Sequence, residues 1–126
     1  MSLANWCILI AGLMPVLTIA FAKQGAPDMD NAAPRDWLEK QTGLRRRADY
    51  AHRNHFEAFP FFAAAVLIAQ QTGVAQHWTD SLAILFICAR LFYTGFYLSN
   101  RPSPRSIAWV VGYLSVICLF VASGLA

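Results

Sequence analysis

Residues 107–126, IAWVVGYLSVICLFVASGLA, carry no charged side chain and decide the fold class of this chain. A helix of that length extends about 30 Å, at about 1.5 Å per residue, and so matches the hydrocarbon core of a bilayer. Residues 3–22 form a second uncharged run that ends at Lys23, and residues 81–100 form a third run that only Arg90 interrupts. We therefore predict an all-α integral membrane protein.

A fourth membrane span requires polar residues at its start. Residues 58–69, AFPFFAAAVLIA, are apolar but too short to cross a bilayer by themselves. A helix from about residue 43 to residue 71 would extend about 40 Å and place its first turns among the lipid headgroups, and Gly73 is a natural stop signal after it. We predict a single domain, residues 1–126, that is a bundle of four transmembrane helices at about 3–22, 43–71, 76–99 and 104–125.

The charged residues are few, and their distribution orients the chain. Of the 126 residues, 57% are hydrophobic and 13% are charged, against roughly 25% charged in soluble domains. All ten lysines and arginines lie within residues 23–53 and 90–105, so the positive-inside rule places the first and third loops in the cytoplasm and both termini outside. The compact loops favour a bacterial inner membrane, or the endoplasmic reticulum in a eukaryote. Five acids are mixed into the first basic segment, which argues against nucleic-acid binding.

Other local features have structural interpretations. Arg45-Arg46-Arg47 is typical of a cytoplasmic anchor for anionic headgroups, and Ala33-Pro34-Arg35-Asp36 predicts a short helix with proline in its first turn. Cys7, Cys88 and Cys118 stand singly in three apolar runs, which is typical of small apolar residues rather than of a disulfide or a metal site. We predict no bound metal.

The candidate site residues begin in front of the short apolar run. Arg53 and Asn54 lie four and three residues before Glu57, so all three can share one helical face. Charge at membrane depth is costly, near 2.5–3.5 kcal/mol for a central arginine, so we expect these groups to have a function. Glu57 can also pair with Arg53, or with the arginine of the next helix, as structural support. We weigh proton relay by His52 and His55 and do not adopt it.

The next predicted helix carries a polar stripe. The stripe lies at positions i, i+3, i+4 and i+7 of an otherwise apolar helix and consists of Arg90, Tyr93, Thr94 and Tyr97. Tyrosines at such positions also occur simply as interfacial anchors. Arg105-Ser106 starts the last helix on the same, cytoplasmic side. Together these clusters offer guanidinium groups to carboxylates, a carboxylate to an ammonium and hydroxyls to amides, which suits a small, multiply charged, peptide-like ligand.

These motifs resemble those of a known family. The segment Ala51-His52-Arg53-Asn54-x-x-Glu57-x-x-Pro60, within residues 45–71, resembles the signature of the MAPEG family, the membrane-associated proteins in eicosanoid and glutathione metabolism. The family's Arg-x-x-Tyr-x-x-x-Tyr motif is matched by Arg90, Tyr93 and Tyr97, and its basic residue at the start of the fourth helix is matched by Arg105-Ser106. The resemblance covers about residues 44–125 and is to bacterial-type members that are similar to microsomal glutathione transferases.

The resemblance implies a homotrimer of four-helix subunits, with one glutathione bound between neighbouring subunits near the cytoplasmic face. By the same resemblance, the residues that would hold glutathione are Arg53, Asn54, Glu57, Tyr93 and Tyr97, with Arg90 supporting them. Arg105, helped by Ser106, would stabilise the glutathione thiolate, with Arg101 as the alternative. A free thiol has a pKa near 8.5, and a nearby guanidinium favours its anion.

The function that this resemblance implies is that of a membrane-bound glutathione transferase, with glutathione-dependent peroxidase activity as a related chemistry. Its expected partners are glutathione, a hydrophobic electrophile or lipid, and membrane lipids, with no nucleic acid. The alternative is a non-catalytic, lipid-binding scaffold of the same family, but such members tend to lose the groups that Glu57 and Arg105 retain here. A transporter ranks third, because polar groups at one end form no continuous path. Tyr50 stands where several relatives have arginine, and Trp109 stands where a tyrosine is common, so that a hydroxyl is missing.

Overall fold

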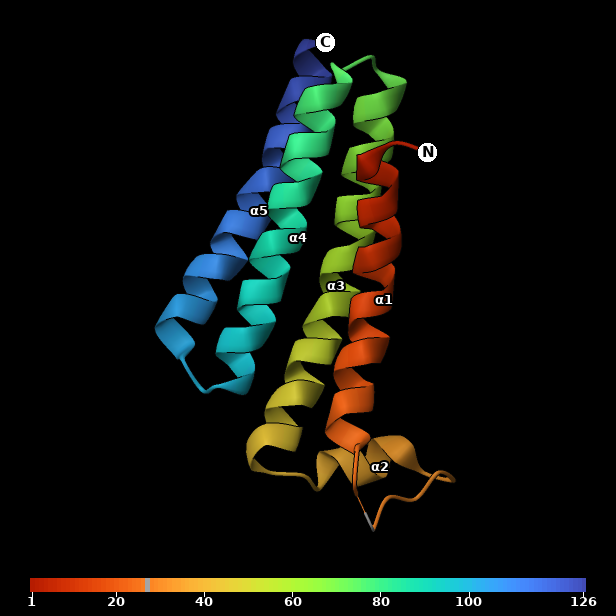
Figure 1. The fold of residues 1–126 in the computed structure, drawn as a ribbon, viewed down its shortest axis with the longest axis vertical. Helices are drawn as coiled ribbons and strands as arrows, with labels where there is room; N and C mark the ends of the chain where they lie inside the picture. Colours follow the sequence, from red (N-terminus) through yellow and green to blue (C-terminus); the bar gives the residue numbers. More distant parts are fainter. Residues whose placement is uncertain (27) are drawn as a thin grey trace.

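The fold is a bundle of long helices. The computed structural model describes residues 1–26 and 28–126, and within these ranges it has no strands. The described residues form five helices in chain order: α1 (Leu3–Lys23), α2 (Pro34–Glu39), α3 (Gly43–Gln71), α4 (Gln76–Leu98) and α5 (Pro102–Leu125). The four long helices run alongside one another, and the short α2 lies at one end (Figure 1). The bounds of the long helices differ from the predicted ones by at most two residues.

The connections between helices gather at two ends of the bundle. Both termini and the α3–α4 turn lie at one end, whereas α2 with its loops and the α4–α5 turn lie at the other (Figure 1). The basic segments 23–53 and 90–105 therefore approach the same end of the molecule. A shared end is what the positive-inside interpretation requires, and the assignment of that end to the cytoplasm stays a prediction.

Three helices have the character of membrane spans. Among the described residues, α1, α4 and α5 are long and apolar enough to cross a membrane. Helix α3 does not meet the same criterion because its apolar run, residues 58–69, is short and polar residues flank it on both sides. Large apolar side chains are exposed along the three spans, among them Leu13, Leu17, Phe92 and Val121, which suits contact with lipid or with another subunit. The chain is thus an integral membrane protein, with α3 as a fourth span still a prediction.

Small residues and one aromatic pair form the core. Ala4 of α1 and Ala65 and Ala69 of α3 are fully buried in the same apolar cluster, and small side chains let helices approach closely where lipid provides no hydrophobic driving force. Phe62 of α3 is also fully buried and stacks on Phe86 of α4, with the ring centroids 3.9 Å apart. These contacts determine how α3 is rotated towards α4.

A tight turn sets where α5 starts. Asn100 adopts a left-handed conformation with φ of 58°, which asparagine tolerates better than most residues, and the Arg101 N–H donates back to a carbonyl of the last turn of α4 at 2.8 Å. Pro102 opens α5, where its missing N–H is not needed by the helix. As a result Arg105 returns to the end of α4, and its guanidinium lies 4.5 Å from the ring centroid of Tyr97.

Candidate functional site

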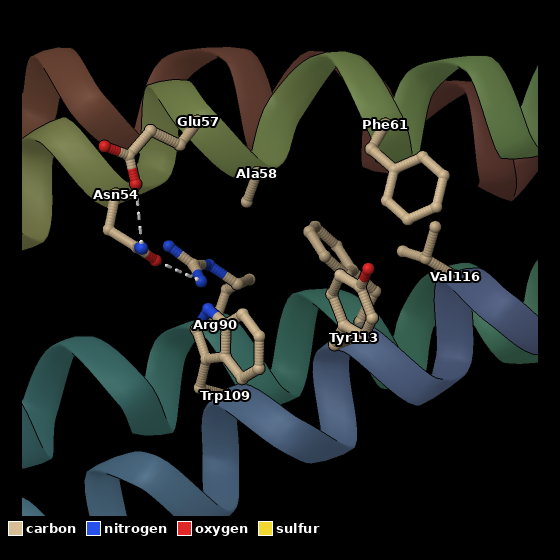
Figure 2. Close-up of a pocket in the computed structure, with 9 residues that line it drawn as sticks. Asn54, Glu57, Ala58, Phe61, Arg90, Trp109, Tyr113 and Val116 are labelled. Carbon is tan, nitrogen blue, oxygen red and sulfur yellow. Dashed lines mark hydrogen bonds between the residues drawn. The ribbon is translucent and has the colours of Figure 1, made fainter.

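Two adjoining pockets lie on α3, α4 and α5. The first is a cavity of about 130 Å³. Its lining residues are Asn54, Glu57, Ala58, Phe61, Phe86, Arg90, Trp109, Tyr113 and Val116. Figure 2 shows Asn54, Glu57 and Arg90 gathered at one end, and Phe61, Tyr113 and Val116 at the other. The second pocket, of about 270 Å³, is lined by Tyr93, Tyr97, Arg105, Ser106, Trp109 and Val110. Since Trp109 belongs to both, it forms the shared wall between two groups of predicted site residues.

A chain of hydrogen bonds orients the polar end of the first pocket. Arg90 Nη1 donates to Asn54 Oδ1 at 2.9 Å, and Asn54 Nδ2 donates to Glu57 Oε2 at 3.2 Å (Figure 2). Because a guanidinium only donates and a carboxylate only accepts, these two contacts determine which way the Asn54 amide faces. The sequence left open an ion pair of Glu57 with Arg53 or Arg90, but neither pair forms among the described residues.

Arg90 is almost fully buried, with 2% of its surface exposed. Besides Asn54, its guanidinium contacts His55 Nδ1, from Nη2 at 2.8 Å and from Nε at 3.3 Å, and it lies 4.3 Å from the ring centroid of Tyr93. Within residues 1–26 and 28–126, no carboxylate lies within ion-pair distance of Arg90. The sequence does not predict the contact of His55 with Arg90, because the two residues are 35 positions apart on different helices and a lone histidine belongs to no motif with a recognisable spacing.

Arg53 lies outside both pockets and is engaged by the first loop. Its Nη2 contacts Asp49 Oδ2 at 3.0 Å and also the carboxylate of Glu39, which in turn pairs with Arg46 at 3.3 Å. Two hydrogen bonds, the more important from Arg53 and the other from Arg46, hold the pKa of Glu39 below its usual range. Arg53 therefore lines neither pocket, whereas Asn54 and Glu57 of the same helix both line the first.

Arg105 and two tyrosines form the second pocket. The Arg105 guanidinium lies over the ring of Tyr97, and Tyr97 meets Tyr93 edge-on with ring centroids 5.6 Å apart. Arg105 is half-buried and Ser106 is exposed, so a ligand can reach both. Arg101, the alternative to Arg105, lines a different groove on the outer face of α4. The polar stripe predicted on α4 therefore meets Arg105 rather than Arg101.

None of the residues that line the two pockets is a cysteine. The three cysteines are free; Cys7 is buried, whereas Cys88 and Cys118 are exposed. In the part of the chain that the structure describes, no three histidine, cysteine, aspartate or glutamate side chains are grouped so that they could hold a metal. The groups that the two pockets offer to a ligand are guanidinium, carboxylate, amide, hydroxyl and indole.

Comparison with known protein families places this chain. A model of the MAPEG family matches residues 3–125, nearly the whole chain. The chain belongs to the MAPEG family. The match includes α1, whereas the resemblance based on sequence motifs begins only at about residue 44. Comparisons with curated proteins and with solved structures give no match. Membership makes this an integral membrane protein of a family that acts in eicosanoid and glutathione metabolism.

Trp109 lines both pockets of this MAPEG chain, whereas Tyr50 lines neither and lies beside the second. Arg46 Nε donates to the Tyr50 hydroxyl at 2.9 Å, and the Arg46 guanidinium lies 4.7 Å from the Tyr50 ring centroid. Tyr50 in turn lies 6.4 Å from Tyr97, measured between ring centroids. Trp109 stacks on Tyr113 with centroids 5.0 Å apart, which adds apolar surface to both pockets.

Proposed function

We propose that this MAPEG protein is a membrane-bound glutathione transferase that conjugates the glutathione thiolate to hydrophobic electrophiles, and that the same thiolate supports glutathione-dependent peroxidase chemistry. The observation that carries the proposal is the pair of pockets joined at Trp109. One pocket offers the carboxylate of Glu57 and the buried guanidinium of Arg90, and the other offers Arg105. Glutathione combines an ammonium, two carboxylates and a thiol, so it requires cationic and anionic partners at once.

Each part of glutathione has a proposed partner. Glu57 binds the ammonium group, and Asn54, supported by Arg90, binds an amide or carboxylate next to it. Tyr93 and Tyr97 bind along the rest of the peptide. Arg105, with the hydroxyl of Ser106, faces the thiol. A guanidinium within a few ångströms of a thiol favours the anion, and the thiolate is the nucleophile that attacks an electrophile.

Arg53 has a conditional role in this proposal. Arg53 forms ion pairs with two carboxylates, those of Glu39 and Asp49, and it reaches a ligand only when it leaves Glu39, the partner outside its own helix. A glutathione carboxylate carries the same charge and can take the place of Glu39. Ligand binding by Arg53 is thus an exchange of one carboxylate for another, and Glu39 acts as a competitor.

We propose that a neighbouring subunit completes the site in a homotrimer. Glu57, Ser106 and Trp109 are exposed in the single chain, so that a second subunit can cover them and exclude water from the thiolate. We further propose that the end carrying α2 and the α4–α5 turn faces the cytoplasm, most simply in a bacterial inner membrane, because both basic segments approach that end.

The test is a titration of the detergent-purified protein with glutathione at neutral pH. A saturable rise in the ultraviolet absorbance of the thiolate is expected, and S-methylglutathione, which has no ionisable thiol, should bind without that signal. Addition of 1-chloro-2,4-dinitrobenzene should then yield the glutathione conjugate. A folded trimer that shows neither binding nor conjugation would overturn the proposal.

A specific observation favours one other function. The outer faces of α4 and α5 form an apolar groove of about 420 Å³, lined among others by Leu85, Phe92, Phe96, Ile107 and Val111. A groove of this kind can hold an acyl chain, as a non-catalytic MAPEG scaffold that presents lipid would require. That function predicts lipid binding in the absence of any thiolate signal, so the same titration separates the two functions.

A further inference from the structure

A closed ring of hydrogen bonds with His55 and Thr94 holds the buried side of Arg90. Arg90 is 2% exposed and has no carboxylate at ion-pair distance within the described ranges, residues 1–26 and 28–126. A buried cation is tolerated only when its donors are hydrogen-bonded. Here Asn54 takes Nη1, and His55 takes both Nη2 and Nε. The imidazole is thus the main acceptor for this guanidinium.

These contacts determine the protonation of His55. The guanidinium can only donate, so His55 Nδ1 accepts and carries no proton. A neutral imidazole then carries its proton on Nε2, which lies 2.8 Å from Thr94 Oγ1 and donates to it. The Thr94 hydroxyl in turn donates a hydrogen bond to the backbone carbonyl oxygen of Arg90 at 2.8 Å. The ring runs from the Arg90 side chain through His55 and Thr94 back to the Arg90 backbone. At each of these hydrogen bonds, only one assignment of donor and acceptor is possible.

The same directed chain continues into the first pocket. From Arg90 it passes to Asn54 Oδ1, and from Asn54 Nδ2 to Glu57 Oε2 (Figure 2). His55 is 3% exposed and lines neither pocket. His55 therefore lies behind three side chains that do line the cavity: Arg90, Asn54 and Glu57.

We propose that His55, backed by Thr94, is a positioning residue: as the neutral Nε2–H tautomer it aims Arg90 at Asn54 and so presets the amide and carboxylate of the glutathione site. The ligand in this proposal rests on the proposed function, whereas the tautomer and the Arg90 contact do not. Proton relay by His55 is a different role, and both ring nitrogens are already engaged away from the cavity.

Substitutions at position 55 separate an acceptor from a space-filling ring. In His55→Asn the amide oxygen lies near the place of Nδ1 and can still accept from Arg90, so glutathione affinity should stay within about threefold of the wild type. His55→Leu removes the acceptor and should weaken binding about 10-fold to 100-fold, as expected for a lost hydrogen bond to a charged group. His52→Leu is the matched control, because His52 lies on the same helix and its Nδ1 contacts the Pro15 carbonyl at 2.8 Å. It should change the affinity by less than about twofold.

A double-mutant cycle shows whether His55 acts through Arg90. In an Arg90→Met background, which removes the buried charge, His55→Leu should have no further effect on glutathione affinity. The double variant Arg90→Met, His55→Leu should still fold, because it leaves no unpaired cation in the core. Equal losses in His55→Asn and His55→Leu, or full additivity in the cycle, would overturn the proposal.

A ligand-free measurement keeps the proposal independent of glutathione. Nitrogen-15 NMR of the histidine side chains in the full-length protein should show His55 as the Nε2–H tautomer. Arg90→Met should shift its Nδ1 resonance and Thr94→Val its Nε2 resonance. An Nδ1–H tautomer, or an Nδ1 signal indifferent to Arg90→Met, refutes the proposal even if glutathione binds. The expected NMR pattern in a protein that binds no glutathione would instead refute the proposed function alone.

Discussion

Replacement of Arg105 by alanine removes the group that we propose stabilises the glutathione thiolate, and the structure bounds the effect. Arg105 lies in the first turn of α5, with its guanidinium 4.5 Å from the ring centroid of Tyr97. The helix itself supplies little positive charge there, because Pro102 and Pro104 have no N–H and the Arg105 N–H already donates to the Arg101 carbonyl at 3.1 Å. The Arg105 guanidinium, rather than the helix N-terminus, is therefore the main source of positive potential at this turn of α5.

The magnitude follows from Coulomb's law and the exposure of Arg105. Two unit charges about 4 Å apart attract by about 4 kcal/mol near a protein surface and by about 1 kcal/mol in water. Arg105 is half-buried, so we take about 2.7 kcal/mol, which lowers a thiol pKa of about 8.5 to about 6.5. Bound glutathione would then be about three-quarters thiolate at pH 7, against about 3% in Arg105→Ala. Turnover should fall about 25-fold, whereas affinity should fall only about fourfold, because only the thiolate loses its partner.

The loss of affinity should also grow with pH. Below about pH 5 the thiol is protonated in both proteins, so that Arg105→Ala should bind glutathione as the wild type does, whereas the Kd ratio should reach about 76 at pH 9. Calorimetric titration at several pH values measures this ratio, and thiolate absorbance measures the ionised fraction. Arg101→Ala is the matched control because Arg101 lines the outer groove. A Kd ratio that is the same at all pH values, with unchanged turnover, would refute the role of Arg105 and point to Arg101 or Arg90.

Three other changes test separate parts of the structure. Glu57→Gln should raise the Kd for glutathione about tenfold by removing the ionic contact to the ammonium group; calorimetry that finds no change would leave Glu57 with a structural role. Glu39→Gln should tighten glutathione binding about twofold to fivefold, because it removes one of the two carboxylates that hold Arg53 and leaves only Asp49. Because pairing lowers the pKa of Glu39, its competing carboxylate is charged at neutral pH and becomes neutral as the pH falls through that lowered pKa. The tighter binding of Glu39→Gln should therefore vanish in acid. Tighter binding that persists in acid would argue against competition. Phe62→Ala should cost about 3–5 kcal/mol of stability in thermal unfolding, since Phe62 is fully buried against Phe86, whereas an unchanged midpoint would mean that this pair does not hold the bundle together.

The helices and their polar faces could be predicted because they depend on local periodicity. Uncharged runs such as residues 107–126 have the length of a membrane span, and no contact elsewhere in the chain can change that length. In the same way Arg90, Tyr93 and Tyr97 fall on one face of any α-helix. Residues 58–69 mark the limit of this reasoning, since the apolar run is too short for the sequence alone to define α3 as a span.

Local sequence patterns are enough to predict the membrane class and the positions of the long helices, and they single out the charged residues that we expect to have a function. Which of those charges face a cavity depends on how the helices pack. Rotation of α3 against α4 turns Asn54 and Glu57 towards the first pocket and leaves Arg53 with Glu39. It also brings His55 onto Arg90, across 35 residues of sequence. The physical reason is that rotation about a helix axis depends on packing against neighbouring helices, which no repeat within one helix encodes.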